Sequence, residues 1–309
     1  MHRSGTRART IKTLKGELSF VRALRRCAHC GHSFAALDQE LGVRPRLSLT
    51  PSLRRKVAWL GGRTSFAEAA RDLKEMLDVS VSSSEFQRVC LEVGARFERL
   101  GRERDEQWRR AVSPQAPAPP PEVSPERLVL MADGTCVLTA AGEEHKTVWC
   151  GRAFALEAAG RTESSDRPFI TDSRFAASGE NFADFGPRLL ALAYRCGFRR
   201  ARKVAFIADG ARCLWRWAKE LPGHCVVLIQ DFWHVCEHLS ALAQELYGPQ
   251  WQEPYARWQQ QLLASQVDEV LEQLRGERAR RRGERARRRG ALRKRLQEEI
   301  GYLEAGRER

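Results

Sequence analysis

The chain has 309 residues, enough for about two domains with hydrophobic cores, and its hydrophobic content of 42% supports a folded protein. Its 53 lysines and arginines against 39 acidic residues give a formal net charge of +14, which indicates a polyanionic partner, nucleic acid first, with a solvated basic surface as the alternative. No apolar run approaches the ~18 residues of a membrane span and the N-terminus lacks a signal-peptide core, so the sequence excludes a membrane partner and predicts a cytoplasmic protein.

Residues 1–50 form a basic region that contains a cysteine knuckle. Cys27 and Cys30 have the spacing that supplies two thiolates to a tetrahedral zinc ion, and His29 and His32 lie in the same turn. A structural zinc site needs four ligands, so this pair is a partial zinc ribbon, with a redox pair or two inert thiols as alternatives. The nine cysteines are odd in number and mostly single, which indicates reduced thiols and not a disulfide framework.

Residues 51–112 are predicted to be helical and to resemble a helix-turn-helix. Two capping boxes, Ser65 to Glu68 and Ser82 to Glu85, each open an amphipathic helix, and a short turn at 78–81 separates the two. This arrangement would place the second helix in the major groove of DNA, whereas a plain helical hairpin is the alternative. The candidate DNA-binding residues are the cations of the second helix: Arg88, Arg96 and Arg99.

A proline-rich linker is predicted at residues 113–125. Six of the thirteen prolines of the chain fall in this segment. Such a composition cannot form a helix or a central strand, so the segment should be a semi-rigid, extended domain boundary.

Residues 126–250 are predicted to fold as an α/β catalytic core. Short apolar runs end at Asp133, Asp209 and Asp231, and helical patterns separate them, with one or two further strands at His145–Leu156. The order strand, strand, helix, strand, helix, strand, helix is that of an RNase H-like mixed sheet with flanking helices, in which carboxylates on the first and fourth strands meet. The predicted fold class is therefore α/β, preceded by a mostly helical N-terminal region.

Asp133 and Asp209 are the candidate metal-binding carboxylates. Each stands in an Asp-Gly pair after a buried-looking strand, although Asp-Gly alone is also a common turn signal. Carboxylates are hard oxygen ligands for Mg²⁺ or Mn²⁺, and two such ions about 3.5–4 Å apart activate an attacking oxygen and stabilise a leaving one. In a basic protein, this pair indicates phosphodiester chemistry.

Residues 251–309 are predicted to be a basic helical insertion or tail. An apolar helical pattern is followed by a tandem duplication, in which the RGERARR sequence at 275–281 recurs at 282–288. A solvent-facing helix that touches phosphate is one explanation, and recent slippage of the coding DNA is another.

The chain resembles a known family through ordered motifs along almost its whole length. In the N-terminal half they are the Cys-x-x-Cys knuckle, Leu37-Asp38 followed by Leu41-Gly42, and Ser65-Phe-x-Glu-Ala-Ala70. In the C-terminal half they are Asp133-Gly-Thr, Asp209-Gly-Ala-x-x-x-Trp215, and Asp231-Phe-Trp-His234-x-x-Glu237-His238-Leu239. Together these motifs resemble bacterial insertion-sequence transposases of the Mutator-like group, which carry a DDE catalytic triad on an RNase H fold.

The resemblance implies a function and a set of site residues. Asp133 and Asp209 would be the first two catalytic acids and would bind Mg²⁺, while Asp231 and His234 would occupy the place of a Cys-x-x-His pair in relatives. The implied reaction is cleavage and strand transfer at insertion-sequence ends. The implied partners are double-stranded DNA and, on that DNA, further copies of the chain.

Two departures from the family pattern predict an incomplete copy. The third acid of the family, a glutamate, follows a glycine-serine-rich motif beyond the segment that resembles Ile300–Glu304, and this chain stops at Arg309. The upstream half of the zinc knuckle is also missing. Three glutamates are nominal substitutes for the third acid, without support from their sequence context: Glu298, Glu299 and Glu304.

Two other functions remain as alternatives. A non-catalytic DNA-binding remnant would retain the basic charge without the full metal site. A zinc peptidase would use His234-x-x-Glu237-His238, a pattern in which two histidines ligate zinc and the glutamate acts as a general base. The peptidase pattern leaves the two Asp-Gly corners and the basic charge unexplained.

Overall fold

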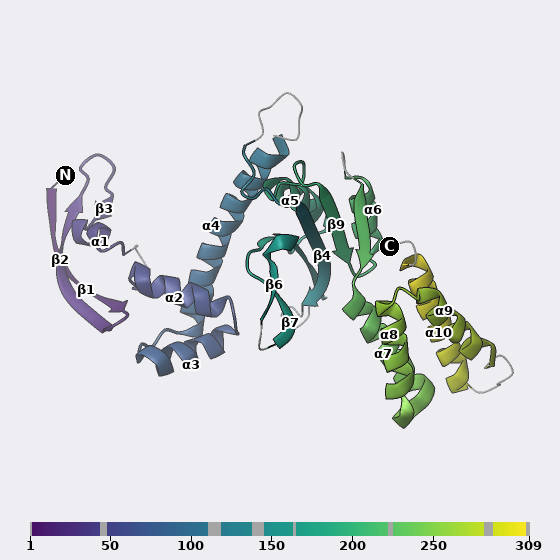
Figure 1. Cartoon of the computed structure of the whole chain (residues 1–309). Helices are drawn as coiled ribbons and strands as arrows, with labels where there is room; N and C mark the ends of the chain where they lie inside the picture. Colours follow the sequence, from purple (N-terminus) through teal and green to yellow (C-terminus); the bar gives the residue numbers. More distant parts are fainter. Residues whose placement is uncertain are drawn as a thin grey trace. The chain divides into compact units, whose positions relative to one another are not determined.

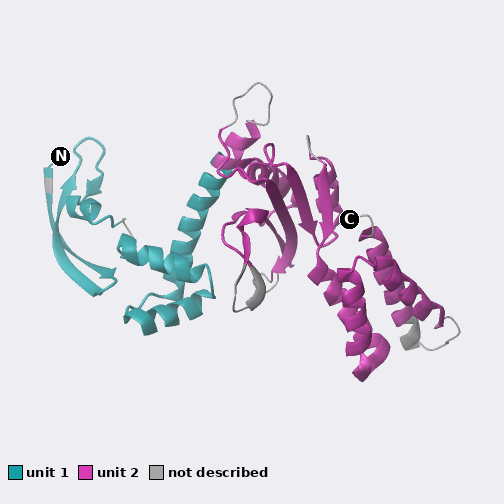
Figure 2. Cartoon of the chain, viewed as in Figure 1, with its two compact units in different colours: residues 1–103 teal, residues 104–309 magenta. Residues whose placement is uncertain are grey.

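The computed structural model describes residues 2–43, 48–110, 119–137, 145–162, 165–221, 225–280 and 287–306. Two compact units make up the chain, residues 1–103 and 104–309 (Figure 2). The division falls within one long helix, α4 (Ser83–Arg110).

Unit 1 begins with a β-hairpin, so the prediction of a mostly helical N-terminal region is wrong for the segment up to Phe34. Strands β1 (His2–Thr13) and β2 (Gly16–Arg26) pair antiparallel, and a short β3 (Ser33–Phe34) extends the sheet before helix α1 (Ala36–Glu40). The hairpin has no clear hydrophobic period because arginines and threonines dominate it and most of its side chains are exposed. The turn depends on Gly16, whose φ of +107° is accessible mainly to glycine.

Three helices form the rest of unit 1, at the positions that the sequence predicts. They are α2 (Pro51–Gly61), α3 (Phe66–Leu77) and the first part of α4. Both predicted capping serines bond the helix start, since Ser65 Oγ accepts from Glu68 N at 3.3 Å and Ser82 Oγ accepts from Glu85 N at 3.2 Å. The helices enclose a core that includes Leu53, Val57, Leu73, Phe86 and Val89.

Unit 2 is built on a five-stranded mixed sheet in the order β10-β9-β4-β5-β8. In this sheet β5 runs antiparallel to both β4 and β8, whereas β9 runs parallel to β4 and β10 parallel to β9. The strands are β4 (Arg127–Val137), β5 (Lys146–Ala155), β8 (Arg174–Ser178), β9 (Lys203–Ala208) and β10 (Val226–Gln230). The predicted mixed α/β sheet with flanking helices is therefore present.

Three strands of unit 2 lie in a stretch where the sequence predicts none. After the 3₁₀ turn η1 (Leu156–Ala158), strands β6 (Ala159–Thr162) and β7 (Ser165–Ile170) form a separate two-stranded sheet, and β8 closes one edge of the main sheet. These strands are short, and an edge strand such as β8 needs no continuous apolar run. Local hydrophobicity therefore could not reveal them.

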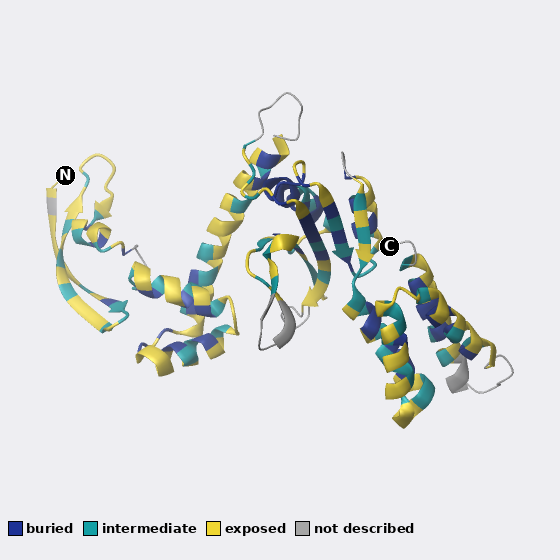
Figure 3. Cartoon of the chain, in the orientation of Figure 1, coloured by how far each residue is buried: buried dark blue, intermediate teal, exposed yellow. Residues whose placement is uncertain are grey.

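The core of unit 2 lies between one face of the main sheet and helices α5 (Phe182–Arg195) and α6 (Arg212–Lys219). Alternate strand residues point into it, including Leu128 and Leu130 of β4 and Phe206 of β9. Figure 3 shows this buried layer in dark blue along β4 and α5. The parallel register places the end of β9 beside the middle of β4, where Asp133 lies, and the end of β10 beside the end of β9.

Residues 119–125, the described part of the predicted linker, are bonded to other segments of unit 2. Residues 119–125 have no helix or strand, and residues 111–118 lie outside the described part of the chain. Glu122 N–H donates to the Arg195 carbonyl at 2.8 Å, and the Glu122 carboxylate pairs with Arg195 at 3.0 Å and with Arg174 at 3.1 Å. This part of the segment is therefore anchored and not a free spacer.

The C-terminal helices form a second core in unit 2. Helix α7 (Phe232–Tyr247) leads through a 3₁₀ turn, η2 (Gly248–Gln250), to the last three helices, α8 (Gln252–Leu263), α9 (Val267–Arg280) and α10 (Arg287–Gly306) (Figure 1). Their apolar faces meet around Trp258, Leu271, Leu296 and Ile300. The duplicated RGERARR segment lies partly outside the described residues. Over the described ranges, no helix is long and apolar enough to cross a membrane.

Candidate active site

The register of β4 and β9 brings the two candidate carboxylates together. The strands pair in parallel from Arg127↔Lys203 to Ala132↔Ala208, and the next residues are Asp133 and Asp209. Residues at matching positions of neighbouring strands lie about 4.8 Å apart and point to the same face. The two aspartates are thus side by side where the parallel pairing ends.

The two candidate catalytic acids and the two additional residues that the resemblance implies line one pocket of about 260 Å³: Asp133, Asp209, Asp231 and His234. Asp231 reaches it because its N–H donates to the Ala208 carbonyl at 2.9 Å, directly after β10. Other walls come from β5 and β8, through Cys150, Gly151, Arg152 and Phe175. Burial raises the pKa of the Cys150 thiol, and the nearby Asp133 carboxylate acts in the same direction.

The Asp209 corner is fixed by its own turn and by helix α10. Asp209 Oδ1 accepts from the Ala211 N–H at 3.0 Å, and Gly210 follows with a φ of +116°. The Tyr302 hydroxyl of α10 donates to the Asp209 carbonyl at 2.7 Å. A Cβ on residue 210 would lie 2.8 Å from the Tyr302 ring, so the ring leaves no room for a side chain at Gly210.

Asp231 has a structural task in addition to its place in the pocket. It is the N-cap of α7, where its Oδ1 accepts from Trp233 N at 2.8 Å and from His234 N at 3.2 Å. The cap turns the first residues of α7 toward the pocket, which explains why Asp231 and His234 line it together.

A polar cluster joins α7 to α10 beside this corner. His238 Nδ1 lies 2.9 Å from Glu299 Oε2, and the His238 ring stacks on Tyr302 with centroids 4.7 Å apart. The rings of His234 and His238 lie 4.9 Å apart. Burial raises the pKa of the Tyr302 phenol, and the carboxylates of Asp209, Glu299 and Asp231 act in the same direction.

None of the three nominal substitutes for the third acid lines the pocket. Glu299 pairs with His238, Glu298 lies 3.7 Å from Lys294, and Glu304 lies 2.7 Å from Arg275. Within the described part of the chain, no group of three or more histidine, cysteine, aspartate or glutamate side chains forms a metal-binding arrangement. Asp133 and Asp209 supply two hard oxygen ligands, and Mg²⁺ commonly completes its shell with water, so the pair fits a single ion.

Two further residues contact the pocket or its Asp209 corner but were not candidate site residues, although Tyr302 lies in the Ile300–Glu304 segment of the family resemblance. Arg152 of β5 lines the pocket, and its guanidinium donates to Ser173 Oγ at 2.9 Å and 3.0 Å. Tyr302 reaches Asp209 from 93 positions away. The register of β5 against β4 sets Arg152 opposite Met131, and an alignment of these two strands could have placed Arg152 near the pocket. The position of Tyr302 near Asp209 depends on the packing of α10.

The N-terminal knuckle forms a turn around its two thiols. Cys27 N–H donates to the His32 carbonyl at 2.8 Å, and Gly31 N–H donates to the Cys27 carbonyl at 3.0 Å. Hydrogen bonds from the backbone N–H groups of Cys30 and His29 lower the pKa of Cys27, and the Cys30 thiol acts in the same direction. No third or fourth ligand joins the pair among the described residues.

The three candidate DNA-binding cations lie on α4, in different surroundings. Arg88 lies 3.4 Å from Glu85, and Arg99 lies 4.0 Å from Glu103, both on the same helix. Arg96 lines a separate groove between α2 and α4. Two of the three arginines thus lie near a glutamate of their own helix, and the third lies at the groove.

We expect the purified chain to lack catalytic zinc at His234 and His238. A catalytic zinc site uses three protein ligands, whereas the described residues provide no such group around these histidines. Elemental analysis of the purified chain measures this directly. Stoichiometric zinc that disappears in His238→Ala, but persists in the Cys27→Ser/Cys30→Ser variant, would instead establish the peptidase-type site.

No protein-family model matches this sequence, and a comparison with curated proteins finds no significant match.

Proposed function

We propose that this chain acts on DNA as a transposase of the Mutator-like type, with an RNase H-like core in residues 126–250. The observation that carries the proposal is the shared pocket of Asp133 and Asp209, on neighbouring parallel strands. In chain order β4 is the first strand of the main sheet and β9 the fourth, which agrees with the expected meeting of carboxylates in an RNase H-like fold. The formal charge of +14 supports DNA as the substrate.

The proposed reaction has two steps. In the first, a water oxygen attacks a backbone phosphorus at an element end and the P–O3′ bond breaks, so that a water proton passes to the departing 3′-oxygen and a 3′-hydroxyl and a 5′-phosphate result. In the second, the oxygen of that 3′-hydroxyl attacks a target phosphorus and forms a new P–O bond, while the target's own P–O3′ bond breaks and the hydroxyl proton passes to the released 3′-oxygen. A bound Mg²⁺ or Mn²⁺ would polarise the phosphoryl oxygens and activate the attacking oxygen.

The residues of the chain would have separate tasks in this reaction. Asp133 and Asp209 would hold the ion, and the Asp209 turn would be kept in place by the Tyr302 hydroxyl. Arg152, at the wall of the pocket, would place a cation beside a phosphate. Asp231 would orient the start of α7 so that His234 faces the pocket.

A non-catalytic DNA-binding protein is the second candidate, and one observation favours it. Two-metal phosphodiester chemistry needs more oxygen ligands than Asp133 and Asp209 offer, and no group of three candidate ligands occurs in the described ranges. The discriminating experiment is cleavage and strand transfer on DNA that carries the ends of the genomic element, with Mg²⁺ or Mn²⁺. DNA retention without any cleavage in either metal would support the binding protein and overturn the transposase.

Duplex DNA binding should depend steeply on salt and little on sequence. Phosphate contacts by lysine and arginine release counterions, so about six contacts would lower the affinity by about 10³-fold between about 50 and 200 mM salt. Fluorescence anisotropy with duplexes of unrelated sequence measures both properties. Arg88→Ala should reduce the salt slope by about one if this cation contacts phosphate. Failure to retain any duplex at low ionic strength would contradict DNA binding altogether.

A further inference from the structure

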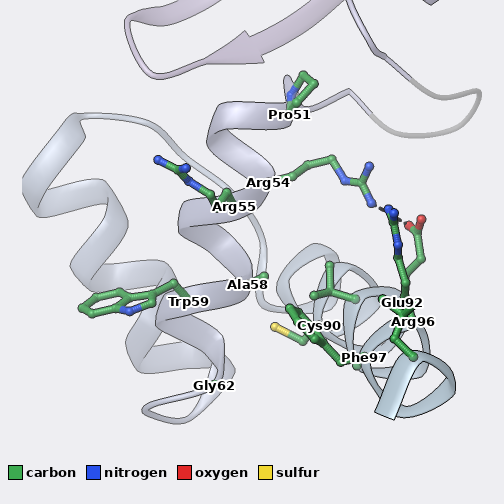
Figure 4. Close-up of a pocket in the computed structure, with 13 residues that line it drawn as sticks. Pro51, Arg54, Arg55, Ala58, Trp59, Gly62, Cys90, Glu92, Arg96 and Phe97 are labelled. Carbon is green, nitrogen blue, oxygen red and sulfur yellow. Dashed lines mark ion pairs between the residues drawn. The ribbon is translucent and has the colours of Figure 1, made fainter. Parts of the chain in front are cut away.

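Unit 1 has an open groove between α2 and α4, far larger than the pocket at the aspartates. Its volume is about 760 Å³, and its lining includes Ala58 and Trp59 of α2 with Val93 and Phe97 of α4 (Figure 4). Trp59 is 58% exposed and Phe97 is 71% exposed. Large aromatic side chains in an exposed groove are typical of interaction surfaces.

The α4 wall of the groove carries a stripe with coiled-coil spacing. Cys90, Val93, Phe97 and Leu100 recur at intervals of three and four residues, which places them on one face of the helix. Phe86, one turn earlier on the same face, is fully buried in the unit 1 core. The stripe therefore continues the core pattern onto a surface that unit 1 leaves uncovered at Phe97 and Leu100.

Two glycines flank this stripe on one side. Gly94 and Gly101 stand seven residues apart in the interior of α4, where glycine disfavours the helix relative to alanine. Among the described residues, a Cβ on either glycine would meet nothing within 4 Å, so no contact there requires glycine. Small residues beside an apolar stripe do allow a second helix to approach closely.

Opposite charges flank the stripe on its other side. Arg96 and Glu103 stand seven residues apart and occupy equivalent positions next to the stripe. When two such helices pair antiparallel, Arg96 of one copy lies by the partner's Glu103, and this contact occurs twice through the two-fold symmetry. The same arrangement sets Phe97 of one copy beside the partner's Leu100.

We propose that two copies of this chain associate through this groove, with their α4 helices antiparallel. The apolar stripe, the glycine flank and the self-complementary charges favour a second copy over other occupants. Duplex DNA prefers a uniformly cationic surface, whereas the three arginines of this groove, Arg54, Arg55 and Arg96, border an apolar lining and Glu92, which is paired with Arg54 at 3.0 Å. The interface is independent of the proposed catalytic site.

The first test is the association state of the full-length chain by sedimentation velocity. The wild-type chain should dimerise, and Phe97→Ser should raise the dimer dissociation constant at least about tenfold. Leu91→Ser is the matched control, because Leu91 is 65% exposed on the opposite side of α4, and it should leave the constant unchanged. A chain that stays monomeric up to about 100 µM overturns the proposal. A dimer that is equally weakened by both variants, or by neither, also overturns it.

Charge reversal tests the antiparallel pairing itself. Arg96→Glu alone and Glu103→Arg alone should each weaken the dimer, since each places like charges together twice. A mixture of these two single variants should form a heterodimer of near wild-type affinity, and the double variant should recover as well. Arg102→Glu is the control, because it makes the same charge change on the side of α4 that faces away from the stripe and its flanking charges.

Recovery in the mixture supports the interface, whereas its failure overturns the antiparallel arrangement. Thermal melting and circular dichroism confirm that each variant is folded. An acidic helical peptide or a DNA duplex that binds the groove while the chain remains monomeric would identify another occupant and reject the second copy.

Discussion

Asp209→Asn should reduce DNA cleavage by the chain by at least about 100-fold, if the chain acts as the proposed transposase. The change removes one of the two carboxylates that would hold the metal ion. Asparagine retains the side-chain oxygen that accepts from the Ala211 N–H, so the turn after β9 should survive. Cleavage of DNA carrying the element ends, followed on denaturing gels in Mg²⁺ and in Mn²⁺, measures the loss.

Asp133→Asn should have a similar effect, because both carboxylates would hold the same ion in the proposed reaction. The matched control is Asp172→Asn, since Asp172 is exposed and pairs with Arg174 away from the pocket. A variant that keeps wild-type cleavage after the loss of Asp133 or Asp209 would remove both residues from the proposed site.

The wild-type chain should itself turn over slowly, and Mn²⁺ should support more cleavage than Mg²⁺. Mg²⁺ demands near-ideal octahedral geometry, and two carboxylates constrain it weakly. Robust turnover that vanished in Asp209→Ala would instead reveal a third ligand. Asp231 would be the first residue to test, since it lines the same pocket.

Phe206→Ala should lower the free energy of unfolding of unit 2 by about 3–5 kcal/mol. The Phe206 ring is fully buried on β9 and packs against Trp215 at 5.8 Å and Trp217 at 5.4 Å between ring centroids. Alanine would leave a cavity that the sheet and α6 cannot close without moving. Urea unfolding followed by circular dichroism measures the difference.

Phe175→Ala provides the control for this loss. Phe175 is 62% exposed on the edge strand β8, so the same chemical change should cost about 0.5 kcal/mol or less. Equal losses in the two variants would contradict the assignment of Phe206 to the core.

Several elements of the fold follow from the sequence because their signals are local. The serine caps at Ser65 and Ser82 depend on residues only three positions away, and both are present. Short apolar runs predict the strands that lead to Asp133 and Asp209, because half of each run faces a core. The position of each candidate acid along the chain is therefore predictable from its immediate neighbours.

The hairpin of β1 and β2 does not follow from the sequence, because a strand that buries few side chains has no hydrophobic period to detect. Strand β8 cannot be predicted for a related reason, since backbone pairing with β5, and not burial, holds it in the sheet. Backbone hydrogen bonds of this kind do not require a hydrophobic pattern in the side chains.

What the sequence determined by itself was the chemical identity and the local setting of Asp133, Asp209, Asp231 and His234. The expected strand order also predicted that Asp133 and Asp209 meet, whereas their shared pocket with Asp231 and His234, and the hydrogen bond from Tyr302 to the Asp209 corner, depend on the folded chain. The tertiary structure also decided that Glu299 bonds His238 and does not line the pocket with the aspartates. These contacts join residues up to 93 positions apart, so no local propensity sets them: the register of β4 and β9 brings the two aspartates together, and packing of α10 against α7 places Tyr302 and Glu299.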